Sequence, residues 1–171
     1  DTSKPKLAVA RRPSVSAINS TGETNMGLDM YLTSNRTTTG GNMWSDDDKR
    51  PMHNGWKQES STYEVAYWRK FAPLHCFIVQ TFADGVDECQ SIHLNANRCI
   101  QVAVALDDKF ATFMEDNEVG GFFFGSPEQW AEDLKDTQDD AATFRKLAKW
   151  IDCREKTSLA EYRAAEYRAS W

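Results

Sequence analysis

The chain has 171 residues, of which 40% are hydrophobic and 27% are charged. A chain of this length supplies about one domain and buries a core without metal or disulfide support. No stretch approaches the roughly 20 apolar residues of a membrane-spanning helix, which excludes an integral helical membrane protein. The net charge of −6 disfavours a protein that mainly neutralises nucleic-acid phosphates.

The first 25 residues differ in character from the rest. They contain Pro5, Pro13 and several serines, with almost no apolar periodicity. Such a composition cannot bury enough apolar surface to order itself. We expect residues 1–25 to be a disordered or draped extension, and residues 26–171 to form a single α+β domain.

Four cysteines lie too far apart for any zinc-binding pattern, so we expect reduced and mostly buried thiols. They are Cys76, Cys89, Cys99 and Cys153. Two acidic clusters, Asp46–Asp48 and Asp84–Glu88, lack the spacing of a calcium loop and are predicted to be solvated turns. No metal and no cofactor are predicted.

The folded part is predicted to begin with a strand and a long loop. Leu28, Met30 and Leu32 alternate with polar or aromatic residues, which predicts a half-buried strand over 28–33. Residues 34–59 lose this periodicity and contain Trp44 and Trp56. Long loops inside compact domains are often functional, and the two tryptophans predict that this loop packs against another surface.

A first helix is predicted over residues 63–82. Ser61 and Glu64 have the spacing of a capping box, and Pro73 is expected to bend the helix because proline lacks a backbone donor. Residues 89–94 then predict a strand. Asn95 predicts the cap of a second helix. The apolar face of that helix comprises Cys99, Ala103, Leu106, Phe110 and Phe113.

The last third predicts a strand, a helix and a repeat. The phenylalanine run between glycines predicts a strand at 121–124, and Ser126, Pro127 and Gln129 predict the start of a third helix. Its apolar face comprises Trp130, Leu134, Ala141, Phe144, Ala148 and Ile151, and its acidic face Glu132, Asp133, Asp136, Asp139 and Asp140. The sequence Ala-Glu-Tyr-Arg-Ala then occurs at 160–164 and again at 165–169.

The predicted fold class is α+β, with three main helices packed on a small mixed sheet of three or four short strands. The strands are expected at 28–33, 89–94 and 121–124, and a fourth strand at 166–170 stays open. A repeat period of five suits neither helix nor strand, so both remain open for residues 157–171.

Candidate ligand-binding residues fall on the predicted first helix. At 100° per residue, Glu64, Trp68 and His75 share one stripe. We expect Trp68 and His75 to face inward together beside the phenylalanine run containing Phe123, forming one hollow, with the cation of Arg69 beside the aromatic rings. The alternative interpretation is that Glu64 caps its helix and His75 is a core residue.

A catalytic alternative also uses His75. Eleven residues of helix separate it from Glu64 by about 16 Å, too far for a direct acid–base pair. A partner would come from the 84–88 turn, and His75 with Asp87 is the candidate pair. No phosphate loop, dinucleotide fingerprint, nucleophile elbow or zinc-protease motif occurs in the sequence, which favours a non-catalytic protein.

Five segments occur in an order that resembles a family of small bacteriophage and prophage proteins. They are Met26–Leu32, Glu64–Lys70, Asp84–Gln90, Gly121–Ser126 and Ser170–Trp171. The resemblance spans about residues 26–171, and relatives usually start at the methionine matching Met26. It implies an origin rather than a mechanism.

Three functional hypotheses follow. The first is a non-catalytic phage accessory protein of the host cytoplasm that binds a host factor or a small nucleotide-like ligand. The second is a small enzyme with His75 as general acid or base. The third is a virion component anchored by its basic N-terminal extension. Membrane association and nucleic-acid binding are not expected, and the oligomeric state stays open.

Overall fold

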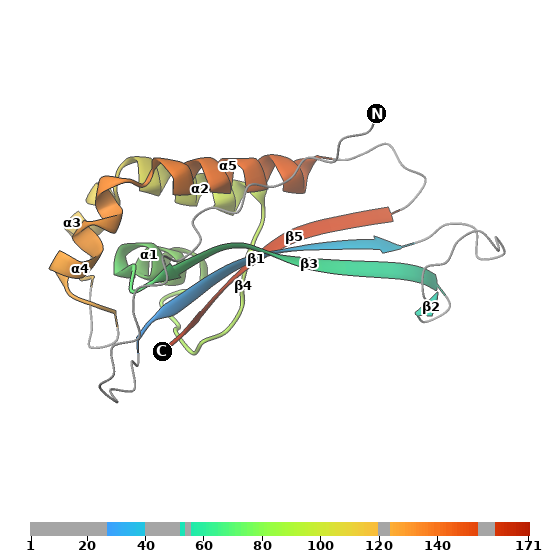
Figure 1. The fold of residues 1–171 in the computed structure, drawn as a ribbon, viewed down its shortest axis with the longest axis horizontal. Coiled ribbons are helices and arrows are strands. Elements are labelled where there is room, and N and C mark those ends of the chain that lie inside the picture. Colours follow the sequence, from blue (N-terminus) through green and yellow to red (C-terminus); the bar gives the residue numbers. More distant parts are fainter. Residues whose placement is uncertain (1–26, 40–51, 54–55, 120–123, 154–159) are drawn as a thin grey trace, which may run out of the picture.

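The computed structural model describes residues 27–39, 52–53, 56–119, 124–153 and 160–171. These residues form two layers, an antiparallel sheet and helices that cover one of its faces (Figure 1). The predicted α+β class is therefore confirmed. The N-terminal extension, Trp44 and Phe123 lie outside the described residues.

The sheet has the strand order β2-β3-β1-β5-β4. The strands are β1 (Asp29–Thr39), β2 (Met52–His53), β3 (Trp56–Arg69), β4 (Ile92–Leu94) and β5 (Ala160–Ser170). Every pairing is antiparallel, so the prediction of a mixed sheet is wrong. Strands β1 and β5 are much longer than predicted, with 11 residues each, and β3, with 14 residues, was not predicted as a strand.

Strand β1 continues far beyond its apolar half. Met30 and Leu32 are fully buried, whereas the residues after Ser34 are exposed or half-buried. Figure 1 shows why, because β1, β3 and β5 project together past the helical layer. Without helices above them these residues need no apolar alternation, and the threonines of β1 favour extended backbone by themselves. A sequence pattern based on burial therefore predicted a loop here.

The prediction of a helix over 63–82 is wrong for the first half of this range. Residues up to Arg69 belong to β3, and helix α1 (Ala72–Phe82) starts after it with Pro73 in its first turn. The register of β1 and β3 shifts between Leu32 and Thr33, which leaves Val65 as an extra residue on β3. Such a bulge interrupts the two-residue period that identifies a strand. Proline is favoured in the first turn of a helix, so Pro73 marks a beginning and not a bend.

The repeated pentapeptide forms a single strand. A shift of five residues is odd, and side chains alternate between the faces of a strand, so equivalent residues of the two copies point to opposite sides. Tyr162 is 59% exposed, whereas Tyr167 is 1% exposed. Likewise, Arg163 lies on the helical side and Arg168 is exposed. The two copies therefore present equivalent residues on opposite faces of one strand.

The helices that follow agree better with prediction. Asn95 caps α2 (Ala96–Asp107) by accepting a hydrogen bond of 2.9 Å from the backbone of Arg98, and Ser126 and Gln129 form the predicted capping box of α4 (Pro127–Ala131). Two breaks were not predicted. Phe110, in the left-handed region, separates α2 from α3 (Ala111–Asp116). A 3-10 turn, η1 (Asp133–Lys135), precedes α5 (Gln138–Asp152).

The core lies between the sheet and the helices α1, α2 and α5. The predicted apolar faces of α2 and α5 are confirmed, with Cys99, Ala103, Leu106, Ala141 and Phe144 fully buried. Helices α2 and α5 lie side by side over the sheet (Figure 1). Among the described residues, none of the helices combines the length and apolarity that a bilayer span requires.

Candidate functional site

His75 lies in a polar network within the core. Its Nδ1 is 2.8 Å from the hydroxyl of Tyr167, and its Nε2 is 2.9 Å from Oδ2 of Asp87. An ionised carboxylate only accepts hydrogen bonds, so Nε2 carries the ring proton and Nδ1 accepts from the tyrosine hydroxyl. This neutral ring has both nitrogens satisfied. The network ties α1 to β5 and to the loop that precedes β4.

Aromatic rings surround His75. The ring centroids of Phe124, Trp171 and Tyr167 lie 5.2, 5.8 and 6.1 Å from that of His75, which is itself 1% exposed. Burial lowers the pKa of His75, opposed by its hydrogen bond to Asp87. Asp87 thus lies within the hydrogen-bond reach that the catalytic hypothesis required. The ring is enclosed and does not open into a cleft where a substrate could reach it, so the geometry fits a structural role.

The lowered pKa of His75 predicts a loss of stability in mild acid. Below pH 6.5, the ordinary value for histidine, the unfolded chain takes up a proton that the buried ring resists, so the stabilisation is complete above pH 6.5 and is lost as pH falls toward the folded pKa. Urea unfolding followed between pH 7.5 and 5 should show this decline. In His75→Gln the decline over this range should be clearly smaller, and an unchanged profile would contradict the assignment.

The other predicted ligand residues lie on β3 and do not share one stripe. Glu64 and Arg69 pair with Thr33 and Asp29 on the face of the sheet away from the helices, whereas Trp68 points toward the helices. The ring of Trp68 stacks on Phe144, with centroids 5.9 Å apart and an angle of 6°. Trp68 and His75 therefore lie in one core but pack on different rings. The helical geometry from which their shared hollow was predicted does not exist.

The face of the sheet away from the helices carries a row of large side chains. Tyr31 on β1 lies directly between Tyr67 on β3 and Arg168 on β5. The two tyrosine rings are 5.3 Å apart, and the Tyr67 hydroxyl donates a hydrogen bond to Asp29. Partial burial and this carboxylate raise the pKa of Tyr67 to about 12, which keeps its hydroxyl protonated as a donor. Asp29 thereby holds the Tyr67 ring beside Tyr31.

A hollow of about 460 Å³ lies at the β5 end of this row. Its lining comprises Tyr31, Thr33, Ser91, Glu166, Arg168, Ala169 and Ser170. Within the described part of the chain, neither Glu166 nor Arg168 has an ion-pair partner within 4.0 Å. The hollow therefore combines the aromatic ring of Tyr31 with the cation of Arg168 and the anion of Glu166, and both charged groups could contact a ligand.

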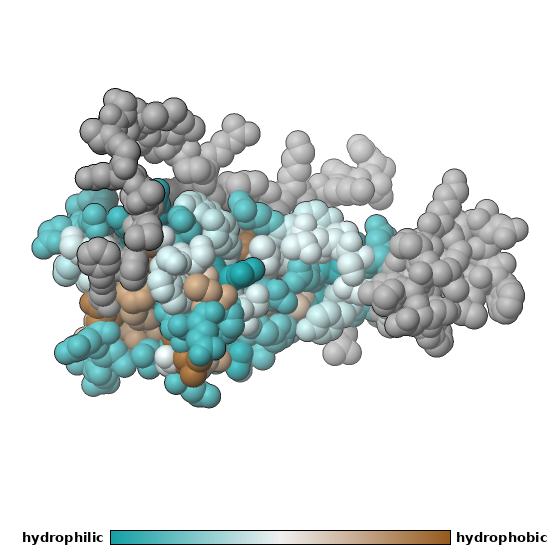
Figure 2. All heavy atoms as spheres, turned by 90° about the horizontal axis from the view of Figure 1, so that it is seen from below, coloured by the Kyte–Doolittle hydropathy of each residue, from teal (hydrophilic) through white to brown (hydrophobic). Residues whose placement is uncertain are grey.

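Figure 2 shows this side of the molecule. Pale and teal residues, of intermediate to high polarity, cover most of its described surface, and brown apolar residues gather at the end where α1, α3 and α4 lie. The open face of the sheet is thus a largely polar surface that also carries the paired rings of Tyr31 and Tyr67. Water covers such a surface without a large penalty, so the chain does not need a second helical layer here.

Sequence reasoning missed Tyr31, Glu166 and Arg168. Tyr31 was assigned to the polar side of a short strand, and the other two belong to the second copy of the repeat. The odd repeat period was the available signal. On a strand it places the Glu and Arg of one copy toward the helices and those of the other copy on the open face.

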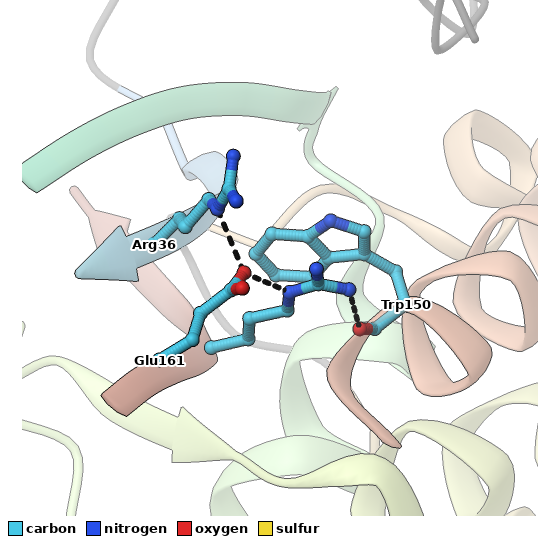
Figure 3. Close-up of polar contacts among 4 residues, drawn as sticks. Arg36, Trp150 and Glu161 are labelled. Carbon is cyan, nitrogen blue, oxygen red and sulfur yellow. Dashed lines mark hydrogen bonds and ion pairs between the residues drawn. The ribbon is translucent and has the colours of Figure 1, made fainter. Parts of the chain in front are cut away.

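The first copy of the repeat forms a separate charged cluster at the end of α5 (Figure 3). Glu161 accepts hydrogen bonds from Arg36 and from Arg163, and Arg163 also donates to the backbone oxygen of Trp150 at 3.0 Å. The guanidinium of Arg163 lies 5.3 Å from the centre of the indole ring of Trp150. Both arginines hold the pKa of Glu161 below its usual value. This arrangement connects β1, β5 and the last turn of α5.

Among the described residues, no group of three His, Cys, Asp or Glu side chains could hold a metal ion, and the Asp46–Asp48 cluster lies outside these residues. All four cysteines carry reduced thiols, as predicted. Cys99 is buried, which raises the pKa of its thiol to about 12, but Cys76 and Cys89 are half-buried and Cys153 is exposed. Only one of the four thiols is buried, so the prediction of mostly buried thiols is wrong.

No family model, no curated protein and no solved structure matches this chain. The geometry of the chain itself is therefore the basis for inferring its function. Its two strongest features are the sealed network around His75 and the open hollow beside Tyr31.

Proposed function

We propose that this protein is a non-catalytic binding protein that holds a small nucleotide-like ligand in the hollow beside Tyr31. The observation that supports this most is the placement of Arg168 directly across the strand pair from Tyr31. A planar base can stack on an exposed tyrosine ring, and a guanidinium suits phosphate because its donors are planar and paired. Thr33, Ser91 and Ser170 add hydroxyl groups at the rim.

Charge favours a single nucleotide over a nucleic-acid strand. The same face of the sheet carries Asp29, Glu64 and Glu166 beside Arg69 and Arg168. A polyanion would approach these carboxylates along its whole length, whereas one phosphate can reach Arg168 alone. The net charge of −6 acts in the same direction. The sequence resemblance extends the proposal to an accessory role for a bacteriophage in the host cytoplasm.

Binding should depend on Tyr31 and Arg168. Nucleoside monophosphates titrated into the full chain by calorimetry are expected to bind. Tyr31→Leu should weaken binding about fivefold or more, because a stacked base contributes roughly 1–3 kcal/mol. Arg168→Gln should weaken binding about tenfold or more, because a hydrogen bond to a charged group contributes roughly 1.5–3 kcal/mol. Tyr162→Leu is the matched control, since Tyr162 is exposed on the same strand as Arg168 but does not line the hollow.

The same variants separate this proposal from a protein partner. If no nucleotide binds at millimolar concentration, the proposal is wrong. Capture of a host protein that is lost in Tyr31→Leu would then assign the open face to a host factor. Retained nucleotide binding in both hollow variants would also contradict the site, because it would place the ligand elsewhere on the chain.

A further inference from the structure

We infer that Glu166 makes the hollow selective for guanine over adenine nucleotides, an inference that rests on the proposed nucleotide site. Glu166 and Arg168 lie two residues apart on the same face of β5. Two residues of strand correspond to about 6.6 Å, so the anion and the cation stand at separate points of one hollow. A ligand that satisfies both must present an acceptor group at one end and donors at the other.

The position of Glu166 relative to Tyr31 suits recognition of a base edge. Glu166 pairs with Thr33, the next residue on the same face of β1 after Tyr31. It is therefore a diagonal neighbour of the tyrosine, about 7–8 Å away between the backbones and within reach of a long side chain. A base stacked on Tyr31 would turn one edge toward Glu166 while its phosphate extends toward Arg168.

The chemistry of a carboxylate then selects the base. An ionised carboxylate has two acceptor oxygens and no donor. Guanine presents two adjacent donors, its N1–H and its 2-amino group, which pair with the two oxygens. Adenine presents a bare N1 acceptor at the same place, and its lone pair would repel the carboxylate. Within the described part of the chain Glu166 has no ion-pair partner, so its charge is free for this contact.

The test compares guanosine, inosine and adenosine monophosphates by calorimetry on the wild-type chain. Guanosine monophosphate should bind about tenfold or more tightly than adenosine monophosphate, with inosine monophosphate between them because it lacks the 2-amino group. In Glu166→Gln this preference should collapse to less than about threefold, while the affinity for adenosine monophosphate stays equal or improves. Glu64→Gln is the matched control, on the same face but outside the hollow, and should keep the preference.

The outcomes distinguish a failure of the nucleotide site from a failure of the role of Glu166. If no monophosphate binds, the proposed function fails and the inference fails with it. If all three bind with equal affinity, or if Glu166→Gln keeps the guanine preference, the site stands and the role of Glu166 is wrong. Deoxynucleoside monophosphates provide a second check. If Glu166→Gln changes the preference for ribose over deoxyribose and not the preference for guanine, Glu166 contacts the sugar, and its proposed role in base recognition is wrong.

Discussion

Replacing His75 by alanine is expected to lower the free energy of unfolding by about 3 kcal/mol. The substitution removes a ring that is 1% exposed and packed on Phe124, and leaves a cavity. It also leaves the hydroxyl of Tyr167 without its 2.8 Å partner in a buried position, which adds a desolvation cost. Urea unfolding at pH 7.5 measures the change, and a loss below about 1 kcal/mol would contradict the network's role.

A double variant separates the hydrogen bond from the packing. His75→Phe and Tyr167→Phe each leave one partner of their shared hydrogen bond unpaired, so each should cost about 1–2 kcal/mol. His75→Phe also removes the partner of Asp87, but this loss is the same in the single and the double variant and cancels in the comparison. Together they remove both partners and replace them by apolar rings. The double variant should therefore be less destabilised than the sum of the two single variants, by about 1 kcal/mol. Strict additivity would show that the bond between the two side chains contributes nothing.

Replacing Glu161 by glutamine should cost about 2 kcal/mol, because two guanidiniums lose the carboxylate that lies between them. Arg36 and Arg163 face each other across the β1–β5 pair, and Glu161 accepts a hydrogen bond from each. The side chains of Arg163 and Glu161 are only 7% and 11% exposed, so the loss at Arg163 accounts for most of this cost, whereas Arg36 is 44% exposed and water screens its share. The loss should appear in urea unfolding and be partly reversed by Arg36→Gln.

The repeat itself supplies the control for Glu161. Glu166 occupies the equivalent place in the second copy of the pentapeptide, but lies on the open face of β5. Glu166→Gln should change the free energy of unfolding by no more than about 0.5 kcal/mol. Equal losses at the two positions would mean that the opposite orientation of the copies has no energetic consequence.

Local chemistry made part of the fold predictable. Asn95 and the Ser126–Gln129 box cap the helices they were expected to cap, because a side-chain oxygen beside an unpaired backbone N–H acts within a few residues. The apolar faces of α2 and α5 were predicted from their spacing, since each packs on a continuous core. These features depend on neighbours in sequence and can be predicted without knowledge of the tertiary structure.

The same reasoning failed where a burial pattern was absent or interrupted. Val65 is an extra residue in β3, so the alternation that would have identified the strand slips by one position and resembles a helical spacing. The outer half of β1 has no alternation because no helix covers it. Only the pairing of strands distant in sequence shows that these residues are extended.

The sequence predicted the contact between His75 and Asp87 but not the position of the candidate ligand site. His75 and Asp87 lie 12 positions apart, and a helix followed by a turn was enough to suggest that they meet. The hollow joins residues around 31, 91 and 168, and its charges face outward because β5 pairs with β1 in one register and not in the next.

The amino-acid sequence by itself determined the α+β class, the helix caps and the apolar faces, because these arise from interactions within a few residues. The tertiary structure alone decided which copy of the repeated pentapeptide joins the helical layer and which borders the hollow. A strand has two faces, and only its pairing with a partner strand and the helices above it determines which face is buried.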